Sequence, residues 1–380
     1  MASTSISNVT DKNFCIGCGM CAALDPEFRL AETPAGFRQV VERPSDLRRL
    51  ERASQVCPFA DSPDETAMAK RLFPAARYQD DAIGRYEAIY AGWSAKHRAL
   101  AGSGGLTRWL LARLLETGAI DFVVTVDSKA FGDAGDLFTS AIHTTAGSYL
   151  ENCSASAYFP VEFDSVIARL RQTPGRFAVT ALPCFARGLR VLADQDAEIG
   201  SRLVMISGVI CGGLKGRRYA DYLAHQMGVA PRKVNRINFR GKTLSQTAHE
   251  QCVEIWANGN DGDKPDGVRR VQELKATDYG AGYFKPKACD YCDDVYAEVA
   301  DIAFGDAWIS PYRHNPDGTN IVVVRNKAID RVLRDAAAEG EIDLEQLTAA
   351  QARQSQLSSL RHRRSGLGGV DKLVDARLGG

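Results

Sequence analysis

The sequence predicts an α/β protein in which a small cysteine-rich N-terminal module precedes a mixed, largely parallel α/β core. From Tyr86 onward, short apolar runs rich in β-branched residues alternate with patterns of helical periodicity, which is typical of a largely parallel sheet. Residues 1–60 lack such runs and carry a dense cluster of cysteines. The 380 residues, 45% hydrophobic and 25% charged, are enough for about two domains with a buried core.

Periodicity also locates the individual elements of the core. Strand-like runs occur at residues 122–126, 177–182, 203–210, 302–304 and 321–324. Apolar residues at three- and four-residue spacing predict helices at 106–116, 161–172, 185–193 and 215–227. The turn-forming residues of 259–267 predict a surface turn or hairpin tip. We therefore expect a module at 1–60, a connecting segment at 61–85, a cofactor-binding α/β domain at 86–360 and a loosely held basic tail at 361–380.

Charge and hydropathy exclude several classes of protein. The chain has 47 basic and 47 acidic residues, so no net positive charge favours a nucleic acid or an anionic membrane surface. The first twenty residues lack the basic and apolar regions of a signal peptide, and no run approaches the roughly 20 apolar residues of a membrane span. We expect a cytoplasmic protein that has no membrane span and binds no nucleic acid.

The N-terminal cysteines have the spacing of an iron–sulfur site. Cys15, Cys18 and Cys21 are separated by two residues each, so one loop can ligate three irons of a 4Fe–4S cluster. Cys57, followed by Pro58, supplies a fourth thiolate in the Cys-Pro form of bacterial ferredoxins. Zinc usually takes its ligands as two separated pairs, and a metal-free thiol site is a further alternative. We therefore predict a ferredoxin-like 4Fe–4S module.

A second set of cysteines is less specific by spacing alone. Cys289 and Cys292 form a C-x2-C pair, while Cys184 and Cys211 each follow a strand-like run. In a parallel sheet both of these would emerge at the carboxyl edge, and Cys184 would begin a helix. The four make a plausible second 4Fe–4S set, against the alternative of buried structural cysteines and a zinc pair. The two remaining cysteines, Cys153 and Cys252, are expected to be plain packing residues.

A glycine loop at residues 101–108 lies directly before a strong amphipathic helix. Its backbone amides and hydroxyls would face a phosphate or a flavin edge at the helix N-terminus, although an ordinary helix-initiating turn explains it equally well. Two polar stretches, 145–149 and 238–242, are either part of the same cavity or solvated loops. The second contributes Arg240 and Lys242, two cations suited to a pyrophosphate.

These motifs together resemble the coenzyme F420 hydrogenase/dehydrogenase beta-subunit family. Within it, the chain is similar to the branch that includes 7-hydroxymethyl chlorophyll a reductase and ferredoxin-dependent divinyl chlorophyllide reductase. The resemblance runs from Cys15 to about Arg325, and its motifs are CIGCGMC with Cys57-Pro58, GSGGLT, ALPCFARGLR, GVICGG, NFRGK, and CDYCDDVYAEVADIAFGDAW followed by GTNIVVVR.

The family resemblance implies an FAD-binding α/β core and iron–sulfur clusters that relay electrons between a carrier and the flavin. It implies that Cys184, Cys211, Cys289 and Cys292 hold the core cluster. It also implies flavin contacts, which carry over to Ser103, Gly104, Gly105 and Thr107, and less securely to Gly147, Ser148, Asn238, Arg240 and Lys242.

The expected function is that of a ferredoxin-dependent FAD and iron–sulfur reductase. Electrons from reduced ferredoxin, or a similar low-potential carrier, would pass through two 4Fe–4S clusters to FAD and on to a small organic substrate as hydride. The catalytic acid stays unassigned among Asp306, His143, His249 and Tyr149, and a homo-oligomer is left open. The alternatives are a beta subunit that exchanges electrons with coenzyme F420 in a larger complex, and a non-enzymatic zinc-binding scaffold.

Overall fold

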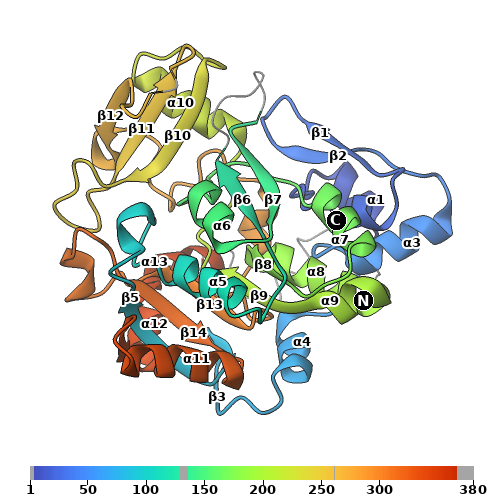
Figure 1. Ribbon diagram of the computed structural model, residues 1–380. Helices are drawn as coiled ribbons and strands as arrows, with labels where there is room; N and C mark the ends of the chain where they lie inside the picture. Colours follow the sequence, from blue (N-terminus) through green and yellow to red (C-terminus); the bar gives the residue numbers. More distant parts are fainter. Residues whose placement is uncertain (1–3, 129–135, 261, 366–380) are drawn as a thin grey trace.

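The computed structural model describes residues 4–128, 136–260 and 262–365, and its centre is a mixed eight-stranded sheet (Figure 1). Four neighbouring strands at the centre are parallel: β6 (Phe122–Ser128), β8 (Phe177–Ala181), β9 (Leu203–Val209) and β13 (Ile302–Asp306). The flanking strands are antiparallel to their neighbours: β14 (Asn320–Val324), β5 (Ala88–Trp93) and β15 (Asp343–Gln346) on one side, and β7 (Phe138–His143) on the other. The prediction of a mixed α/β core is confirmed, with the parallel part at its centre.

Helices pack on both faces of this sheet, because alternate side chains of each strand enter two different cores. On one face, α5 (Leu106–Glu116), α6 (Ala146–Asn152) and α11 (Lys327–Ala338) cover residues such as Met205 and Val322. The other face packs against α7 (Asp164–Gln172), α8 (Pro183–Gln195) and α9 (Ala197–Arg202). The helices α8 and α9 connect β8 to β9, which is the kind of crossover that a parallel pair requires.

A smaller antiparallel sheet of three strands lies beside the main one in the described part of the chain: β10 (Val234–Gly241), β11 (Cys252–Ala257) and β12 (Gly267–Arg270). It shares a core with α10 (Arg217–Gln226). The segment predicted as a hairpin tip connects β11 to β12, which pair antiparallel, so that prediction is confirmed. Figure 1 shows this sheet and α10 as a separate layer beside the main sheet.

The N-terminal segment packs directly on the hydrophobic core at the face of the main sheet that α7, α8 and α9 cover. It consists of α1 (Ile6–Asp11), α2 (Met20–Leu24), the hairpin β1 (Arg29–Glu32) and β2 (Arg38–Glu42), and α3 (Leu47–Val56). Phe14, Ile16 and Met20 are buried in the same hydrophobic cluster as strands β8 and β9. The segment therefore shares its apolar core with the sheet.

Two segments differ from their sequence interpretation. The connecting segment 61–85 contains α4 (Glu65–Leu72) and most of the hairpin β3 (Tyr78–Asp80) and β4 (Gly84–Tyr86). The predicted loose tail begins instead as a π-helical turn, Arg361–Ser365, which continues α12 (Ala349–Ser355) and α13 (Leu357–Leu360) and packs on the protein. Arginine side chains in this turn donate hydrogen bonds to the partly buried carbonyl groups of Cys292 and Asp293, which is the physical reason for the difference. The rest of the predicted tail, 366–380, lies outside the described residues.

Short 3-10 turns complete the described elements at Arg98–Leu100, Val271–Glu273, Lys287–Tyr291 and Tyr312–His314. Within the three described stretches, none of the helices has the length and apolar character needed to cross a bilayer.

Candidate functional site

The four N-terminal cysteines line one small cavity at the junction of α2, the β1–β2 hairpin and the end of α3. Cys15, Cys18 and Cys21 come from the loop and helix after Phe14, and Cys57 caps α3. Burial raises the pKa of all four thiols, and for Cys18, Cys21 and Cys57 repulsion between neighbouring thiolates raises it further, to about 12 for Cys57. Such a set of buried thiols needs a positively charged partner before it can carry thiolates.

Backbone amides approach these sulfurs closely. The Val40 amide nitrogen lies 3.5 Å from the Cys15 sulfur and donates to it. Gly17 has a φ of +70°, and a Cβ on it would lie 2.3 Å from the carbonyl oxygen of Arg38. Only glycine fits there, and the loop between Cys15 and Cys18 can therefore pack closely on β2.

The structure brings the second set of cysteines together at the carboxyl edge of the parallel strands. Cys184 is the second residue of α8, directly after β8, and Cys211 follows the neighbouring strand β9. Cys289 and Cys292 arrive from the loop before β13. Burial raises the pKa of Cys184 most, and the thiolates of Cys292, Cys211 and Cys289 raise it further. The strand ends thus place Cys184 and Cys211 at the carboxyl edge, as expected, and the cluster that the four cysteines would bind stays a prediction.

The two cysteine sets are neighbours. The Cys18 thiolate contributes to the raised pKa of Cys184, which belongs to the other set. Phe163 connects them: its amide donates to the Cys18 carbonyl oxygen at 3.2 Å, and its ring makes an edge contact with Phe185 at 5.5 Å. Phe185 directly follows Cys184, so one packed path joins both sets.

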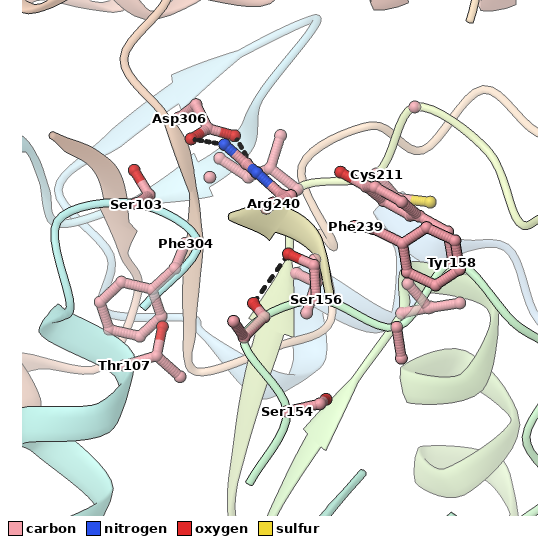
Figure 2. Close-up of a pocket in the computed structure, with 18 of the residues that line it drawn as sticks. Ser103, Thr107, Ser154, Ser156, Tyr158, Cys211, Phe239, Arg240, Phe304 and Asp306 are labelled. Carbon is pink, nitrogen blue, oxygen red and sulfur yellow. Dashed lines mark hydrogen bonds and ion pairs between the residues drawn. The ribbon is translucent and has the colours of Figure 1, made fainter. Parts of the chain in front are cut away.

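A cavity of about 770 Å³ opens at the carboxyl ends of β6, β8, β9 and β13, between the main sheet and the smaller one (Figure 2). One part is polar, with Ser103 and Thr107 of the glycine loop and α5. Another is aromatic, with Tyr158 and Phe239. Cys211 lies in its wall and also belongs to the second cysteine set. The cavity is therefore in contact with that set.

The glycine loop borders this cavity, as predicted. Ser103, Gly105 and Thr107 line it, whereas Gly104 packs behind the loop. A Cβ on Gly104 would lie 2.6 Å from the Gly92 carbonyl oxygen in β5 and 2.7 Å from a backbone nitrogen of β14. The loop therefore lies directly on the sheet, and Gly104 is required by close packing.

Arg240 and Lys242 have roles that differ from the expected pair of free cations. Arg240 lines the cavity, but its guanidinium donates to both carboxylate oxygens of Asp306, at 2.7 and 2.6 Å, and to Gln251 at 2.7 Å. Lys242 donates to the carbonyl oxygens of Arg98, Ser103 and Asp317. Arg240 is thus neutralised by a carboxylate, and Lys242 anchors the glycine loop to its neighbours.

The other predicted flavin contacts lie away from the cavity lining. Gly147 and Ser148 are in the first turns of α6, where the Ser148 hydroxyl is bonded to His143 Nδ1 at 2.9 Å. The amide of Asn238 donates to Glu254 at 2.9 Å on the smaller sheet. None of these three residues lines the cavity with the glycine loop.

The candidate acids also differ in whether they line the cavity. Asp306, His249 and Tyr149 line the cavity. His143 is held between Ser148 and Asp127, with 3.0 Å from its Nε2 to the carboxylate. Burial lowers the pKa of His249, and nearby Arg313 and His314 lower it further. Three of the four candidate acids therefore border the cavity, and His143 does not.

Several lining residues were missed by the sequence interpretation. They are Thr180, Lys215, Tyr158 and Tyr279, together with residues 354–359. Lys215 is buried with its ammonium group over the Tyr219 and Tyr279 rings, and burial lowers its pKa to about 8. Lys215, Tyr158 and Tyr279 lie in loops, where no periodic pattern marks them, whereas residues 354–359 come mostly from α12 and α13.

Among the residues that the structure describes, no three histidine, cysteine or acidic side chains are close enough to bind a single metal ion. One zinc ion brings its sulfurs within about 4 Å of one another, whereas the ligands of an iron–sulfur cube are spaced more widely. The absence therefore concerns a site for a single ion and not a site for a cluster.

Comparison with known proteins identifies the class. Residues 89–168 match the family model for the N-terminal part of coenzyme F420 hydrogenase/dehydrogenase, beta subunit, and residues 175–350 match the model for its C terminus. The chain belongs to this family, whose members are oxidoreductases or redox subunits. The resemblance to the family is confirmed, and the chlorophyll reductase branch stays a prediction.

Several solved chains share the fold, and one of them illustrates the similarity. It is a chain of the F420-reducing NiFe hydrogenase complex from Methanosarcina barkeri, determined as a xenon derivative, with 15% identity and a TM-score of 0.56 over 77% of this chain and 94% of that chain. No curated protein matches the sequence.

Proposed function

We propose that the protein is an iron–sulfur flavoprotein oxidoreductase. It takes electrons from reduced ferredoxin or a similar low-potential carrier, through two 4Fe–4S clusters and FAD, to a small organic substrate by hydride transfer. The observation that carries this proposal is the position of Cys211, which belongs to the second cysteine set and also lines the large cavity. A 4Fe–4S cluster bound to the second cysteine set would therefore lie next to an FAD bound in the cavity.

The donor chemistry of the two cysteine sets fits iron–sulfur clusters. In each set, burial raises the pKa values of all four thiols. The pKa reaches about 12 at Cys57 in the N-terminal set and at Cys292 in the second set. Iron supplies the positive charge that would keep such thiols ionised, and amides such as that of Val40 already donate to sulfur. The loops with Cys15 and Cys289 would thus each hold one cluster.

The large cavity fits an organic cofactor. Its volume of about 770 Å³ lies in the range typical of ligand sites. The Thr180 hydroxyl in its wall is buried without a hydrogen-bond partner among the described residues, so it is free to bond to a ligand. Ser103, Gly105 and Thr107 would face one part of FAD, and the aromatic wall with Tyr158 and Phe239 would face another.

FAD, when bound, accepts single electrons and delivers them in pairs, which adapts one-electron clusters to an organic substrate. The chain's own residues would hold and orient the cofactor. Arg240, bound to Asp306 and Gln251, rigidifies one side of the cavity, and Lys242 fixes the glycine loop from behind. The protein would supply position and electrostatics.

The test is anaerobic purification of the full chain with counts of iron, sulfide and flavin. About eight irons, about eight sulfides and about one flavin per chain are expected, with a brown absorption spectrum. Reduction of the bound flavin by reduced ferredoxin should follow on mixing. A colourless, folded protein with stoichiometric zinc would instead identify a zinc-binding scaffold, and the redox proposal would be wrong.

A second candidate is a beta subunit that exchanges electrons with coenzyme F420 inside a larger complex. It is supported by the family match and by the fold shared with a chain of a hydrogenase complex. The isolated chain, mixed in parallel with reduced ferredoxin and with reduced coenzyme F420, separates the two. Flavin reduction by coenzyme F420 alone would favour the second candidate.

A further inference from the structure

Arg363 lies beside the second cysteine set, outside the region matched by the family models. It belongs to the turn after α13 and is 2% exposed. Its guanidinium donates to the Cys292 carbonyl oxygen at 3.0 Å and to the Cys211 carbonyl oxygen at 3.4 Å, and one terminal nitrogen is 3.8 Å from the Cys211 sulfur. The side chain thus contacts two of the four cysteine positions directly.

The charge of Arg363 has no carboxylate partner within 4 Å in the described parts of the chain. Arg187, which lies near the N-terminal set, differs because it forms an ion pair with Glu65 at 2.9 Å. The Nε atom of Arg363 is also buried and has no hydrogen-bond partner among the described residues. A buried charge and a buried donor left in this way require an anion that accepts hydrogen bonds.

Among the described residues, the second cysteine set is the nearest group that could supply a negative charge to Arg363. The carbonyl oxygens of Cys211 and Cys292 accept hydrogen bonds from the Arg363 guanidinium, and the Cys211 sulfur lies 3.8 Å from one of its terminal nitrogens. A cluster on four thiolates carries net negative charge, so it fits beside this cation.

We propose that Arg363 is the counter-charge of the second cluster and raises its reduction potential relative to a neutral side chain at this position. This inference rests on the proposed function, because it requires a cluster at Cys184, Cys211, Cys289 and Cys292. Reduction adds one electron and hence one negative charge to the cluster. The fixed guanidinium stabilises the reduced form more than the oxidised form, and its Nε hydrogen is available to a cluster sulfur. Arg363 is thus a tuning residue on the electron path.

The test is an anaerobic redox titration of the full-length holoprotein with dithionite as the reductant, followed by electron paramagnetic resonance. The C18S variant identifies the signal of the N-terminal cluster by its loss. R363Q removes the charge but keeps hydrogen-bond donors for the carbonyl groups, R363K keeps the charge, and R361Q changes an exposed arginine of the same turn as the matched control.

In R363Q we expect the reduction equilibrium of the second cluster to become about tenfold less favourable, which corresponds to about 59 mV for one electron. R363K and R361Q should stay within about threefold of the wild type, and the N-terminal cluster should be unchanged in all three. Equal potentials in R363Q and wild type, at full iron content, would overturn the inference and leave the proposed function standing. A shift in R363K as large as in R363Q would also overturn it, because the charge would not be the cause. A wild-type protein with only one cluster would overturn both proposals.

Discussion

Phe14 and Tyr291 lie with their ring centroids 5.0 Å apart, at an interplanar angle of 59°. Phe14 directly precedes Cys15, and Tyr291 lies between Cys289 and Cys292, so this contact joins the two cysteine sets. It also fills the space between them with apolar side chains, since Phe14 is 2% exposed. Packing at this junction protects both sites from water.

We expect F14A to lower the free energy of unfolding by about 3 to 5 kcal/mol, because a buried phenyl ring is removed and a cavity remains. Loss of iron in air should also accelerate. Urea unfolding and the decay of visible absorption measure the two effects. F14L retains most of the volume and should cost less than about 1.5 kcal/mol. An F14A protein as stable as wild type would contradict the role of this contact.

Substitution of a single cysteine tests the assignment of ligands. C18S should lower the iron content from about eight to about four per chain, because one cluster loses a thiolate and the other keeps all four. Iron and sulfide counts after anaerobic purification measure this. C252S is the matched control, since Cys252 is equally buried but lies in β11, outside both sets. Full iron content in C18S would remove Cys18 from the assignment.

Gly104 in the glycine loop and Gly147 in α6 form a matched pair of glycines. G104A should destabilise the protein by about 1 to 3 kcal/mol and lower its flavin content, because the new Cβ meets backbone atoms of β5 and β14. G147A should be neutral or stabilise by about 0.5 to 1 kcal/mol, since nothing lies within 4 Å of its Cβ position in α6. Thermal unfolding and flavin absorbance are the measurements. Equal flavin content in both variants would show that the glycine loop does not contribute to flavin binding.

The Arg240–Asp306 pair should contribute strongly to the stability of the cavity. Its side chains are only 10% and 15% exposed, so D306N leaves a largely buried guanidinium without its counter-charge and should cost about 3 kcal/mol. Urea unfolding measures the loss. E42Q is the control, because the Arg29–Glu42 pair is 66% and 60% exposed and should contribute less than about 1 kcal/mol. Similar losses in both variants would show that burial of the pair is unimportant.

Asp25 gives a pH dependence to the N-terminal segment. It caps α2, which contains Cys21, and accepts hydrogen bonds from Arg49 in α3, which ends before Cys57. The Arg49 guanidinium holds the pKa of Asp25 below its usual value. The folded-state pKa is therefore the lower one, so this stabilisation is present at neutral pH and is lost as the pH falls below about 4.

We expect D25N to lower the stability by about 0.5 to 1 kcal/mol at pH 7, because Arg49 is partly exposed to solvent. The difference from wild type should disappear at a pH well below 4, where Asp25 is protonated. Unfolding of both proteins across this range is the measurement, and D343N, at an exposed position of β15, should follow wild type throughout. A D25N deficit that persists in acid would assign the effect to packing instead.

Local patterns were sufficient for the centre of the fold. The strands β6, β8 and β9 and the helix α5 lie within three residues of their predicted bounds, because buried strands and amphipathic helices are encoded by neighbouring residues. The flanking strands β5, β7 and β15 were not predicted. Their place in the sheet depends on which neighbouring strand is open to pair with them.

The candidate site likewise combines local features, which the sequence predicted, with contacts between distant segments, which it did not. Spacing indicated the N-terminal cysteine set and the glycine loop, since a cluster loop and a helix start are local features. The second cysteine set was predicted from strand ends, one C-x2-C pair and the family resemblance. The pairing of Arg240 with Asp306 joins β10 to the end of β13, 66 residues apart in the chain. Nothing in the sequence near Arg240 specifies that neighbour.

The sequence by itself determined the family and the alternation of strands and helices at the core, and it predicted which cysteines would ligate iron. Tertiary structure alone decided that the N-terminal segment shares its core with the main sheet, that Lys242 supports the glycine loop, and that Arg363 lies against Cys211. The physical reason is that side-chain periodicity and ligand spacing are set by adjacent residues. The position of a buried charge is set by packing between segments that are far apart along the chain.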